Sequence, residues 1–375
     1  MAENLTMIPV NEPVLDGNER KYLNECIDTG WISSEGPFIR EFENLFAARV
    51  GRKHGVAVCN GSAALDAALA AMNLAPGDEV IMPTFTIISC ATAITRLGAI
   101  PVLIDCESDT WNMNVSAVEA RITPKTRAIM VVHLYGLPVD MDPILDIAKR
   151  HNLQVIEDAA EMIGQTYRGK PCGSFGELST FSFYPNKHVT TGEGGMVVTD
   201  DDELAEKLRR LRNLGFSPPR RFVHEELGWN FRMTNLQAAV GLAQLERLDE
   251  FVAKKRHIFA RYTKLLSGTP GIELPVAEKD FATNINWVYG IVIADEVSFD
   301  AEEAMARLAK LGVGTRPFFW PMHEQPVYLR MGFFAGEQHP NAERIARRGF
   351  YLPSGLALSD AQMDKVAAAV KEVFG

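Results

Sequence analysis

The sequence lacks the features that mark membrane, disulfide-linked and nucleic-acid-binding proteins. No apolar run approaches the roughly 20 residues of a membrane-spanning helix, and the chain does not open on a basic stretch followed by an apolar one. The five cysteines are scattered, without a CxxC pair or a metal-ligand spacing. Acidic residues outnumber basic ones by 48 to 38, which disfavours broad contact with a phosphate backbone. We expect a cytoplasmic protein with reduced thiols, no secretory signal and no metal site.

The remaining composition is that of a globular protein. Hydrophobic residue types make up 47% of the 375 residues and charged types 23%, which argues against extensive disorder. Single cores stop growing at about 250–300 residues, so this length predicts a large domain followed by a smaller one. We place the large domain at residues 1–250 and the small C-terminal domain at residues 251–375.

Short β-branched runs alternate with helical patterns through the predicted large domain. Strands are predicted at 55–59, 79–82, 101–105, 128–133, 154–158, 178–183 and 196–199. Helices are predicted at 63–72, 115–121, 143–151, 201–214 and 235–266. Several strands are continuously apolar, as in strands buried on both faces, and the alternation is typical of an α/β fold with a mostly parallel seven-stranded sheet.

The predicted small domain is a less regular mixture of strands and helices. Its strands are predicted at 287–293 and 315–319, and its helices at 301–311, 341–348 and 360–373. Between the two predicted domains, the Pro- and Arg-rich segment 215–228 reads as a long loop, and loops of this length are usually functional or interfacial.

Four predicted strand ends carry side chains that suit a binding site, although each has an ordinary structural explanation on its own. Lys187 precedes a glycine-rich turn, but a lone lysine is most often a surface charge. Asp158 ends a buried strand, where an arginine or a helix N-terminus could pair with it. Gly61 and Ser62 begin a helix, and a Gly-Ser start is a common helix cap. Phe85 alone would most often be a core residue.

Taken together, the four ends predict one site, because ligands collect at the carboxyl ends of parallel strands. They offer an amine nucleophile, a carboxylate for a ring nitrogen, an anion-binding helix start and a flat aromatic ring. These are the parts of a site for pyridoxal phosphate.

Several segments resemble the PLP-dependent nucleotide-sugar aminotransferases of the DegT/DnrJ/StrS family. The resemblance runs from about residue 8 to residue 354. Its marks are the segments 31–37 (WISSEGP), 60–65 (NGSAAL), 83–86 (PTFT), 133–136 (HLYG), 157–160 (EDAA), 182–195 (SFYPNKHVTTGEGG) and 230–234 (NFRMT). The resemblance implies the fold type I, aspartate aminotransferase-like architecture with PLP as the cofactor.

The resemblance also implies roles for individual residues. Lys187 matches the Schiff-base lysine and general base, Asp158 the partner of the pyridine nitrogen, and Phe85 the residue that stacks on the ring. The phosphate contacts match Gly61, Ser62, Ala63 and Ser182.

Three further positions carry consequences of the resemblance. Asn230 matches a residue that reaches the phosphate across a subunit interface, which implies a homodimer. Glu161 stands near the cofactor's phenolic oxygen, where relatives often carry Gln or His, and a carboxylate there would repel a phenolate unless it is protonated. His188 adjoins the active position, and related 3-dehydratases carry His in place of the lysine. The spacing to the GEGG turn favours Lys187 and therefore transamination.

Within the family, the segments 15–20, 316–319 and 321–323 resemble enzymes that aminate C4 of a nucleotide-linked 4-keto-6-deoxy sugar with L-glutamate as donor. For the sugar pocket we single out Trp31, Arg316 and His323, although a histidine is more often structural. The candidate cations for the substrate diphosphate are Arg220, Arg221, Arg232 and Arg316. Other keto-sugar or cyclitol aminotransferases, a sugar 3-dehydratase and a non-catalytic regulator remain alternatives.

Overall fold

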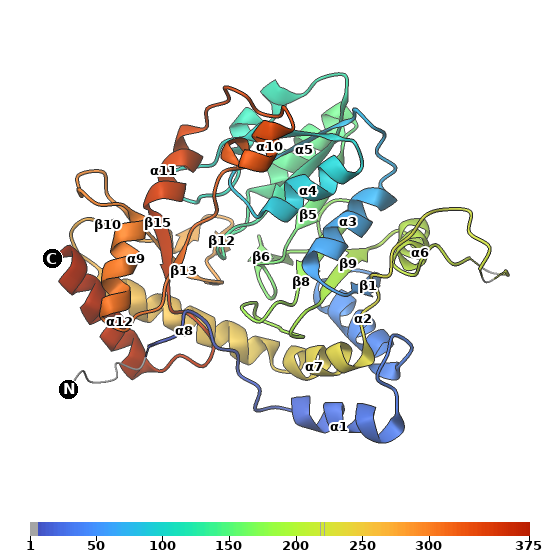
Figure 1. Ribbon diagram of the computed structural model, residues 1–375, viewed down its shortest axis with the longest axis horizontal. Coiled ribbons are helices and arrows are strands. Elements are labelled where there is room, and N and C mark those ends of the chain that lie inside the picture. Colours follow the sequence, from blue (N-terminus) through green and yellow to red (C-terminus); the bar gives the residue numbers. More distant parts are fainter. Residues whose placement is uncertain (1–6, 218, 221) are drawn as a thin grey trace.

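The apolar segments between residues 54 and 199 form one seven-stranded sheet in the computed structural model, which describes residues 7–217, 219–220 and 222–375 (Figure 1). Its strands are β1 (His54–Val58), β2 (Glu79–Pro83), β3 (Ile100–Ile104), β4 (Thr126–Val132), β5 (Gln154–Asp158), β8 (Leu178–Ser182) and β9 (Gly195–Thr199). Their spatial order is β1-β9-β8-β5-β4-β2-β3. Strand β9 runs antiparallel to both neighbours and the other pairs are parallel, which confirms the predicted α/β fold.

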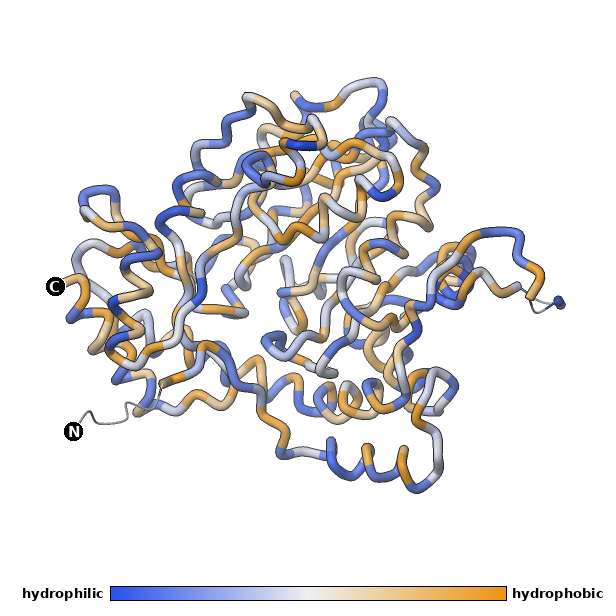
Figure 2. The backbone as a smooth tube through the Cα atoms, in the orientation of Figure 1, coloured by the Kyte–Doolittle hydropathy of each residue, from blue (hydrophilic) through white to orange (hydrophobic). Residues whose placement is uncertain are grey.

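Helices cover both faces of this sheet, because its strands are apolar on both sides. Helices α3 (Gly61–Ala71), α4 (Ile88–Arg96) and α6 (Asp202–Leu211) pack on one face. Helices α2 (Pro37–Arg49), α5 (Met141–His151) and α7 (Asn235–Leu245) pack on the other, and α1 (Glu19–Thr29) lies along α7. In Figure 2, α1 mixes apolar and polar residues, as expected of a helix with one buried side, whereas α7, which packs against both α1 and α2, has no exposed residue.

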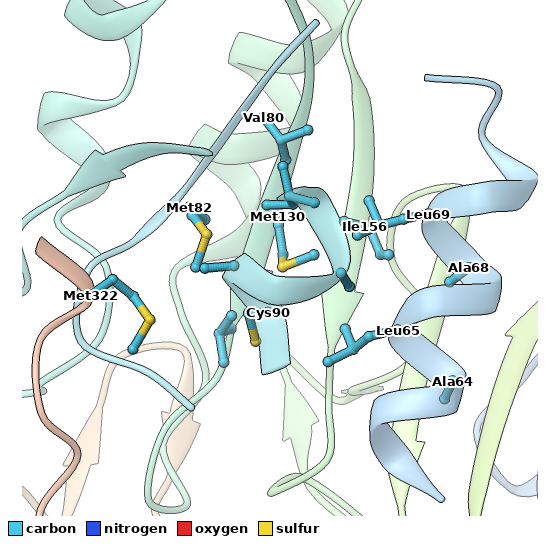
Figure 3. Packing of buried hydrophobic residues seen from close by; sticks show 14 of the residues in the cluster. Ala64, Leu65, Ala68, Leu69, Val80, Met82, Cys90, Met130, Ile156 and Met322 are labelled. Carbon is cyan, nitrogen blue, oxygen red and sulfur yellow. The ribbon is translucent and has the colours of Figure 1, made fainter. Parts of the chain in front are cut away.

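The small side chains of α3 allow that helix to lie close to the sheet. Figure 3 shows Leu65 and Leu69 pointing from α3 toward Ile156, with Ala64 and Ala68 on a different side of the helix. All four are buried almost completely. Because α3 begins directly after β1, this packing fixes the position of its N-terminus at the carboxyl edge of the parallel strands.

The C-terminal part builds a second, smaller sheet. It is antiparallel, with the order β10-β13-β15-β14 and the bounds β10 (Ile272–Glu273), β13 (Tyr289–Ile293), β15 (Gly349–Leu352) and β14 (Arg316–Pro317). Its helices are α8 (Leu248–Leu266), α9 (Ala301–Lys310), α10 (Pro326–Arg330), α11 (Pro340–Arg348) and α12 (Asp360–Phe374). Two short hairpins complete the fold, β6–β7 (Thr166–Tyr167 and Lys170–Pro171) and β11–β12 (Glu278–Lys279 and Ala282–Thr283).

The N-terminal segment joins the C-terminal core and not the large sheet. Ile8 pairs with Val313 and is buried among side chains of the C-terminal elements. The division of the chain between residues 250 and 251 stays a prediction. Such a division would cut α8, which contains residue 250, and it would assign Ile8 to the large domain although Ile8 is buried among C-terminal side chains.

Three predicted elements differ from the observed ones. The helix predicted at 115–121 consists of two short 3-10 helices, Val115–Ala117 and Glu119–Arg121. The single helix predicted at 235–266 is interrupted after residue 245, so that α7 covers the large sheet while α8 reaches the small one. The strand predicted at 315–319 pairs only at Arg316–Pro317. No helix in the described ranges combines the length and apolarity needed to cross a membrane.

Candidate active site

A cavity of about 560 Å³ lies at the carboxyl ends of β4, β5 and β8 and the N-terminus of α3. This is where a doubly covered parallel sheet is expected to bind its ligand. Of the residues that the sequence singled out, the cavity walls include Gly61, Ser62, Asp158, Glu161, Ser182 and Lys187. The structure therefore brings together three of the four predicted strand ends, which are up to 126 positions apart in the chain, counted from Gly61 to Lys187.

Lys187 stands in the loop between β8 and β9, and its side chain is 10% exposed. Its Nζ lies 3.6 Å from Oε1 of Glu161 and 3.8 Å from the ring centre of Trp287. Burial lowers the pKa of Lys187, while the negative charges of Glu161 and Asp158 partly oppose that shift. A lysine with a lowered pKa supplies the neutral amine that nucleophilic chemistry requires.

His188, the next residue, is completely buried and does not line the cavity. Neither of its ring nitrogens has a hydrogen-bond partner in the described part of the chain. The spacing to the GEGG turn predicted that Lys187, and not His188, is the residue of the site. In the structure, Lys187 lines the cavity and His188 does not.

Asp158 is the last residue of β5 and is 4% exposed. Its carboxylate accepts hydrogen bonds from the Ala160 N–H at 3.1 Å and from the Cys90 thiol at 3.4 Å. Burial raises the pKa of Asp158, and within the described ranges no arginine forms an ion pair with it. A buried carboxylate that faces a cavity without an arginine partner is suited to a cationic group of a ligand.

Glu157, the neighbouring carboxylate, is satisfied inside the protein. It is completely buried and accepts hydrogen bonds from His133 Nε2, the Gly173 and Phe175 backbone N–H groups, and Ser179 Oγ, at 2.6–3.0 Å. Its role is therefore to anchor the end of β5, which positions the next residue toward the cavity.

The start of α3 offers donors for an anion. Asn60 caps the helix by accepting the Ala63 N–H at 2.8 Å, and a Cβ on Gly61 would lie 2.8 Å from Cβ of Ser182. Glycine at position 61 therefore allows the helix start to approach β8, and Ser62 and Ser182 both line the cavity there. The predicted phosphate contact of Ala63 is not supported. Ala63 is buried and does not line the cavity, and its N–H already donates to the Asn60 side chain that caps the helix.

The prediction that Phe85 stacks on a cofactor ring is wrong. Phe85 is completely buried, and its ring packs against Tyr135, Phe318 and Phe319 at centroid distances of 6.0–6.1 Å. Ile87, two residues further, is 43% exposed and lines the cavity. The sequence located the correct loop, but the aromatic residue faces the core and an aliphatic one faces the site.

The four residues predicted for the substrate lie outside this cavity. His323 is 4% exposed, and its ring nitrogens form hydrogen bonds with Thr84 Oγ1 at 2.8 Å and Glu343 at 3.1 Å. It is therefore a structural histidine and not the predicted part of the sugar pocket. Arg316 is exposed and pairs in register with Tyr351, which does line the cavity, so it lies near the rim.

Trp31 and Arg232 line two other hollows, which share the walls Ser34, Glu35, Ile39, Arg209 and Arg212. Trp31 is 51% exposed, and the Arg232 guanidinium donates to Asn230 and Asn213. Asn230 is exposed and is not part of the cavity wall of its own chain. Arg220 is exposed in the long loop, and Arg221 lies outside the described residues.

Sequence reasoning missed Trp287, which lines the cavity beneath Lys187. Its indole N–H donates to the Asn186 carbonyl at 2.8 Å, and its own carbonyl accepts from Lys255 at 2.7 Å. A lone tryptophan 100 positions from the lysine carries no local signal of this contact.

Two buried polar atoms on the cavity wall test whether the site suits a polar ligand. Thr180 Oγ1 and Asn186 Oδ1 are both buried, and neither has a hydrogen-bond partner among the residues that the structure describes. Buried polar groups are normally satisfied, so their orientation favours a ligand that completes their bonding. With the reactive lysine, the buried carboxylate and the hydroxyls at the helix start, the walls fit a phosphorylated pyridine aldehyde.

Comparisons with known proteins agree with this site. A model of the DegT/DnrJ/EryC1/StrS aminotransferase family matches residues 13–371. GDP-perosamine synthases of Caulobacter vibrioides and Escherichia coli O157:H7 are 47% and 43% identical, with 99% and 98% of both chains covered. The solved structure of DesV from S. venezuelae in complex with a ketimine intermediate has a TM-score of 0.86 at 36% identity, covering 95% of this chain and 94% of that one. The predicted fold type I architecture is confirmed, and the chain belongs to the DegT/DnrJ/EryC1/StrS aminotransferase family.

Proposed function

We propose that this protein is a pyridoxal 5′-phosphate (PLP)-dependent aminotransferase that transfers the amino group of L-glutamate to C4 of GDP-4-dehydro-6-deoxy-D-mannose. The product is GDP-perosamine, a precursor of O-antigen in lipopolysaccharide biosynthesis. The observation that carries the proposal is the cavity that joins Lys187, Asp158 and the start of α3. Identity of 41–47% to three GDP-perosamine synthases over nearly the whole chain supports the choice of substrate.

When bound, PLP supplies a conjugated ring that accepts electrons from a carbon that loses its proton. Lys187 would hold the cofactor through its amine, and after an amino substrate has displaced it, the freed amine would move the proton as general base and acid. Asp158 would hold a proton on the ring nitrogen. The Ser62 and Ser182 hydroxyls, with the backbone N–H groups at Gly61, would bind the phosphate.

The burial of Lys187 suits both of its roles. A lysine with a lowered pKa has a larger neutral fraction near pH 7 than an exposed one, and the neutral amine is the form that attacks a carbonyl and accepts a proton. Glu161 and Trp287, at 3.6 and 3.8 Å, hold the amine at the cavity wall when it is protonated.

We further propose a cytoplasmic homodimer that takes a nucleotide sugar and L-glutamate as substrates. Asn230, Arg232 and Trp31 do not line the cavity of their own chain, and Asn230 and Trp31 are exposed, which suits contact with a second subunit's site. In the proposed dimer, Arg232, together with Arg220, Arg221 and Arg316, would provide positive charge for the substrate diphosphate.

A direct assay tests the proposal. The purified protein is loaded with PLP and incubated with L-glutamate and a panel of nucleotide keto-sugars, and the products are identified by mass spectrometry. We expect 2-oxoglutarate and a GDP-linked 4-amino sugar. A product that forms without glutamate consumption would favour the dehydratase alternative, and amination of a different nucleotide sugar or a cyclitol would correct the substrate.

Borohydride reduction of the loaded protein locates the covalent link. We expect the label on Lys187, and Lys187→Ala should lose the label and all transfer from glutamate. Lys125→Ala is the matched control, because Lys125 is exposed and precedes the amino end of β4, whereas the cavity lies at the carboxyl end of that strand, and it should behave like the wild type. Steady transamination by Lys187→Ala would refute the assignment.

A further inference from the structure

Glu161 is a carboxyl group held inside the cavity beside Lys187. It is 6% exposed, its Oε2 accepts the Tyr135 N–H at 2.7 Å, and its Oε1 points to Nζ of Lys187 at 3.6 Å, beyond hydrogen-bond length. One oxygen is therefore fixed by the backbone while the other faces the position where Lys187 would bind the cofactor.

The charges around Glu161 do not balance if every acid is ionised. The titratable groups that act on it or feel its charge from the surrounding elements are Lys187, Asp158, Cys90, Tyr135 and Tyr351. Lys187 is the only cation among them, and Asp158 is a second buried carboxyl group in the same cavity. Two carboxylates that share one counter-charge in a buried site are unfavourable, so one of them tends to keep its proton.

The two carboxyl groups differ in what they face. Asp158 is suited to a cationic ring nitrogen and must be ionised for that role. Burial raises the pKa of Glu161 to about 7, even though the charge of Lys187 lowers it. Once the Lys187 nitrogen is bonded to the cofactor, it is no longer an ammonium ion, and in its deprotonated form it carries no positive charge that would oppose protonation of Glu161.

We propose that, with PLP bound, Glu161 is protonated and donates a hydrogen bond from Oε1 to the phenolic oxygen of the cofactor. This inference rests on the proposed function. In pyridoxal the phenolic oxygen is attached to the ring carbon next to the one that bears the aldehyde, so a bond at Nζ brings that oxygen toward Oε1. An ionised Glu161 would repel it, whereas a neutral carboxyl group acts as a donor, as the amide of glutamine would.

The pH titration of the visible band of the loaded protein tests this protonation state. The band reports the protonation of the nitrogen that joins Lys187 to the cofactor. A neutral donor at the phenolic oxygen favours the deprotonated form and lowers the midpoint, whereas an anionic carboxylate favours the protonated form and raises it. The sign of the shift on removing Glu161 therefore distinguishes the two states.

The variants are Glu161→Gln, which keeps a neutral donor, and Glu161→Leu, which removes it. We expect the midpoint of Glu161→Gln within about 0.5 pH unit of the wild type, and that of Glu161→Leu to rise by about one unit. A fall of about one unit or more in both variants would overturn the proposal, because it would mean that a negative charge had been lost.

Infrared difference spectra between the loaded wild type and loaded Glu161→Gln provide a second readout. We expect the carbonyl stretch of a protonated carboxyl group at neutral pH, and its absence would count against the proposal even if Glu161→Leu fails to fold. If the wild type shows no visible band and borohydride labels no lysine, the proposed function fails. If the band is normal but the midpoints fall, the failure concerns Glu161 alone.

Discussion

At the scale of single residues, the charge state of Asp158 decides whether the proposed chemistry is possible. Asp158→Asn keeps the size and the Ala160 N–H contact of the side chain but removes the charge that would hold a proton on the ring nitrogen. We expect turnover with glutamate to fall at least a hundredfold, because the ring is then a weaker electron acceptor. Cofactor affinity should change much less.

Stopped-flow spectroscopy of the glutamate half-reaction, together with a PLP titration, measures the two effects separately. Asp109→Asn is a suitable control, because Asp109 is a partly exposed carboxylate that pairs with Lys279 away from the cavity. Near-normal turnover of Asp158→Asn would remove Asp158 from its proposed role.

Strand ends were the part of the site that could be predicted from the sequence. Asp158 ends one apolar strand and Lys187 follows another, and the sheet geometry alone brings such positions to one edge. The direction of a loop side chain has no such signal, so Phe85 was predicted at the cavity although it faces the core. Trp287 was missed because its contact with Lys187 depends on how the C-terminal segment folds back onto the large sheet.

At the scale of elements, one buried lysine joins α8 to the segments next to β13 and β15 of the small sheet. Lys255 is 1% exposed, and its Nζ donates to the carbonyls of Trp287 at 2.7 Å and Ser354 at 2.6 Å. Through Trp287, this contact supports the wall on which Lys187 rests. The helix therefore contributes both to the stability of the C-terminal part and to the geometry of the site.

Replacing Lys255 with Met should destabilise the protein, because two buried carbonyl groups lose their donor. We expect the unfolding free energy to fall by about 2–4 kcal/mol. Urea unfolding of the wild type and the variant measures the difference. Lys254→Met, at the neighbouring and more exposed position, is the matched control and should change stability little.

The same pair of variants should show a defined pH dependence. Burial lowers the pKa of Lys255 to about 7, whereas an unfolded lysine titrates near about 10.4. Between these values the unfolded chain binds more protons than the folded one, so raising the pH favours folding of the wild type. The advantage over Lys255→Met should grow by up to about 1 kcal/mol per unit between pH 7.5 and 8.5. A difference that shrinks would contradict the assignment of a neutral, buried amine.

At the scale of the whole molecule, several exposed features favour a second subunit. Leu227, Ile32 and Trp31 are 92%, 50% and 51% exposed, although each is a large apolar side chain. Leu227 belongs to the segment after α6, which projects from the body at the right of Figure 1. Exposed apolar side chains on a projecting segment are typical of a surface that packs on another chain.

The position of Asn230 gives this dimer a functional test. Asn230 is exposed and absent from its own cavity wall, so if it binds the cofactor phosphate, it does so in the partner's cavity. Asn230→Ala should therefore weaken PLP binding, while Lys187→Ala abolishes transfer. Each homodimer has two defective sites, but a mixed dimer has one site with Lys187 from one subunit and Asn230 from the other, both intact.

Co-expression of the two variants with different affinity tags allows the mixed dimer to be isolated. We expect it to regain about half of the wild-type activity per dimer, because one of its two sites is complete. A double variant carrying Lys187→Ala and Asn230→Ala in the same chain, co-expressed with the wild type, is the matched control. Its mixed dimer would have two sites with one defect each and should stay at the level of the single variants. The reverse pattern, with about half of the activity in the double-variant dimer and little in the other, would show that Asn230 acts within its own chain.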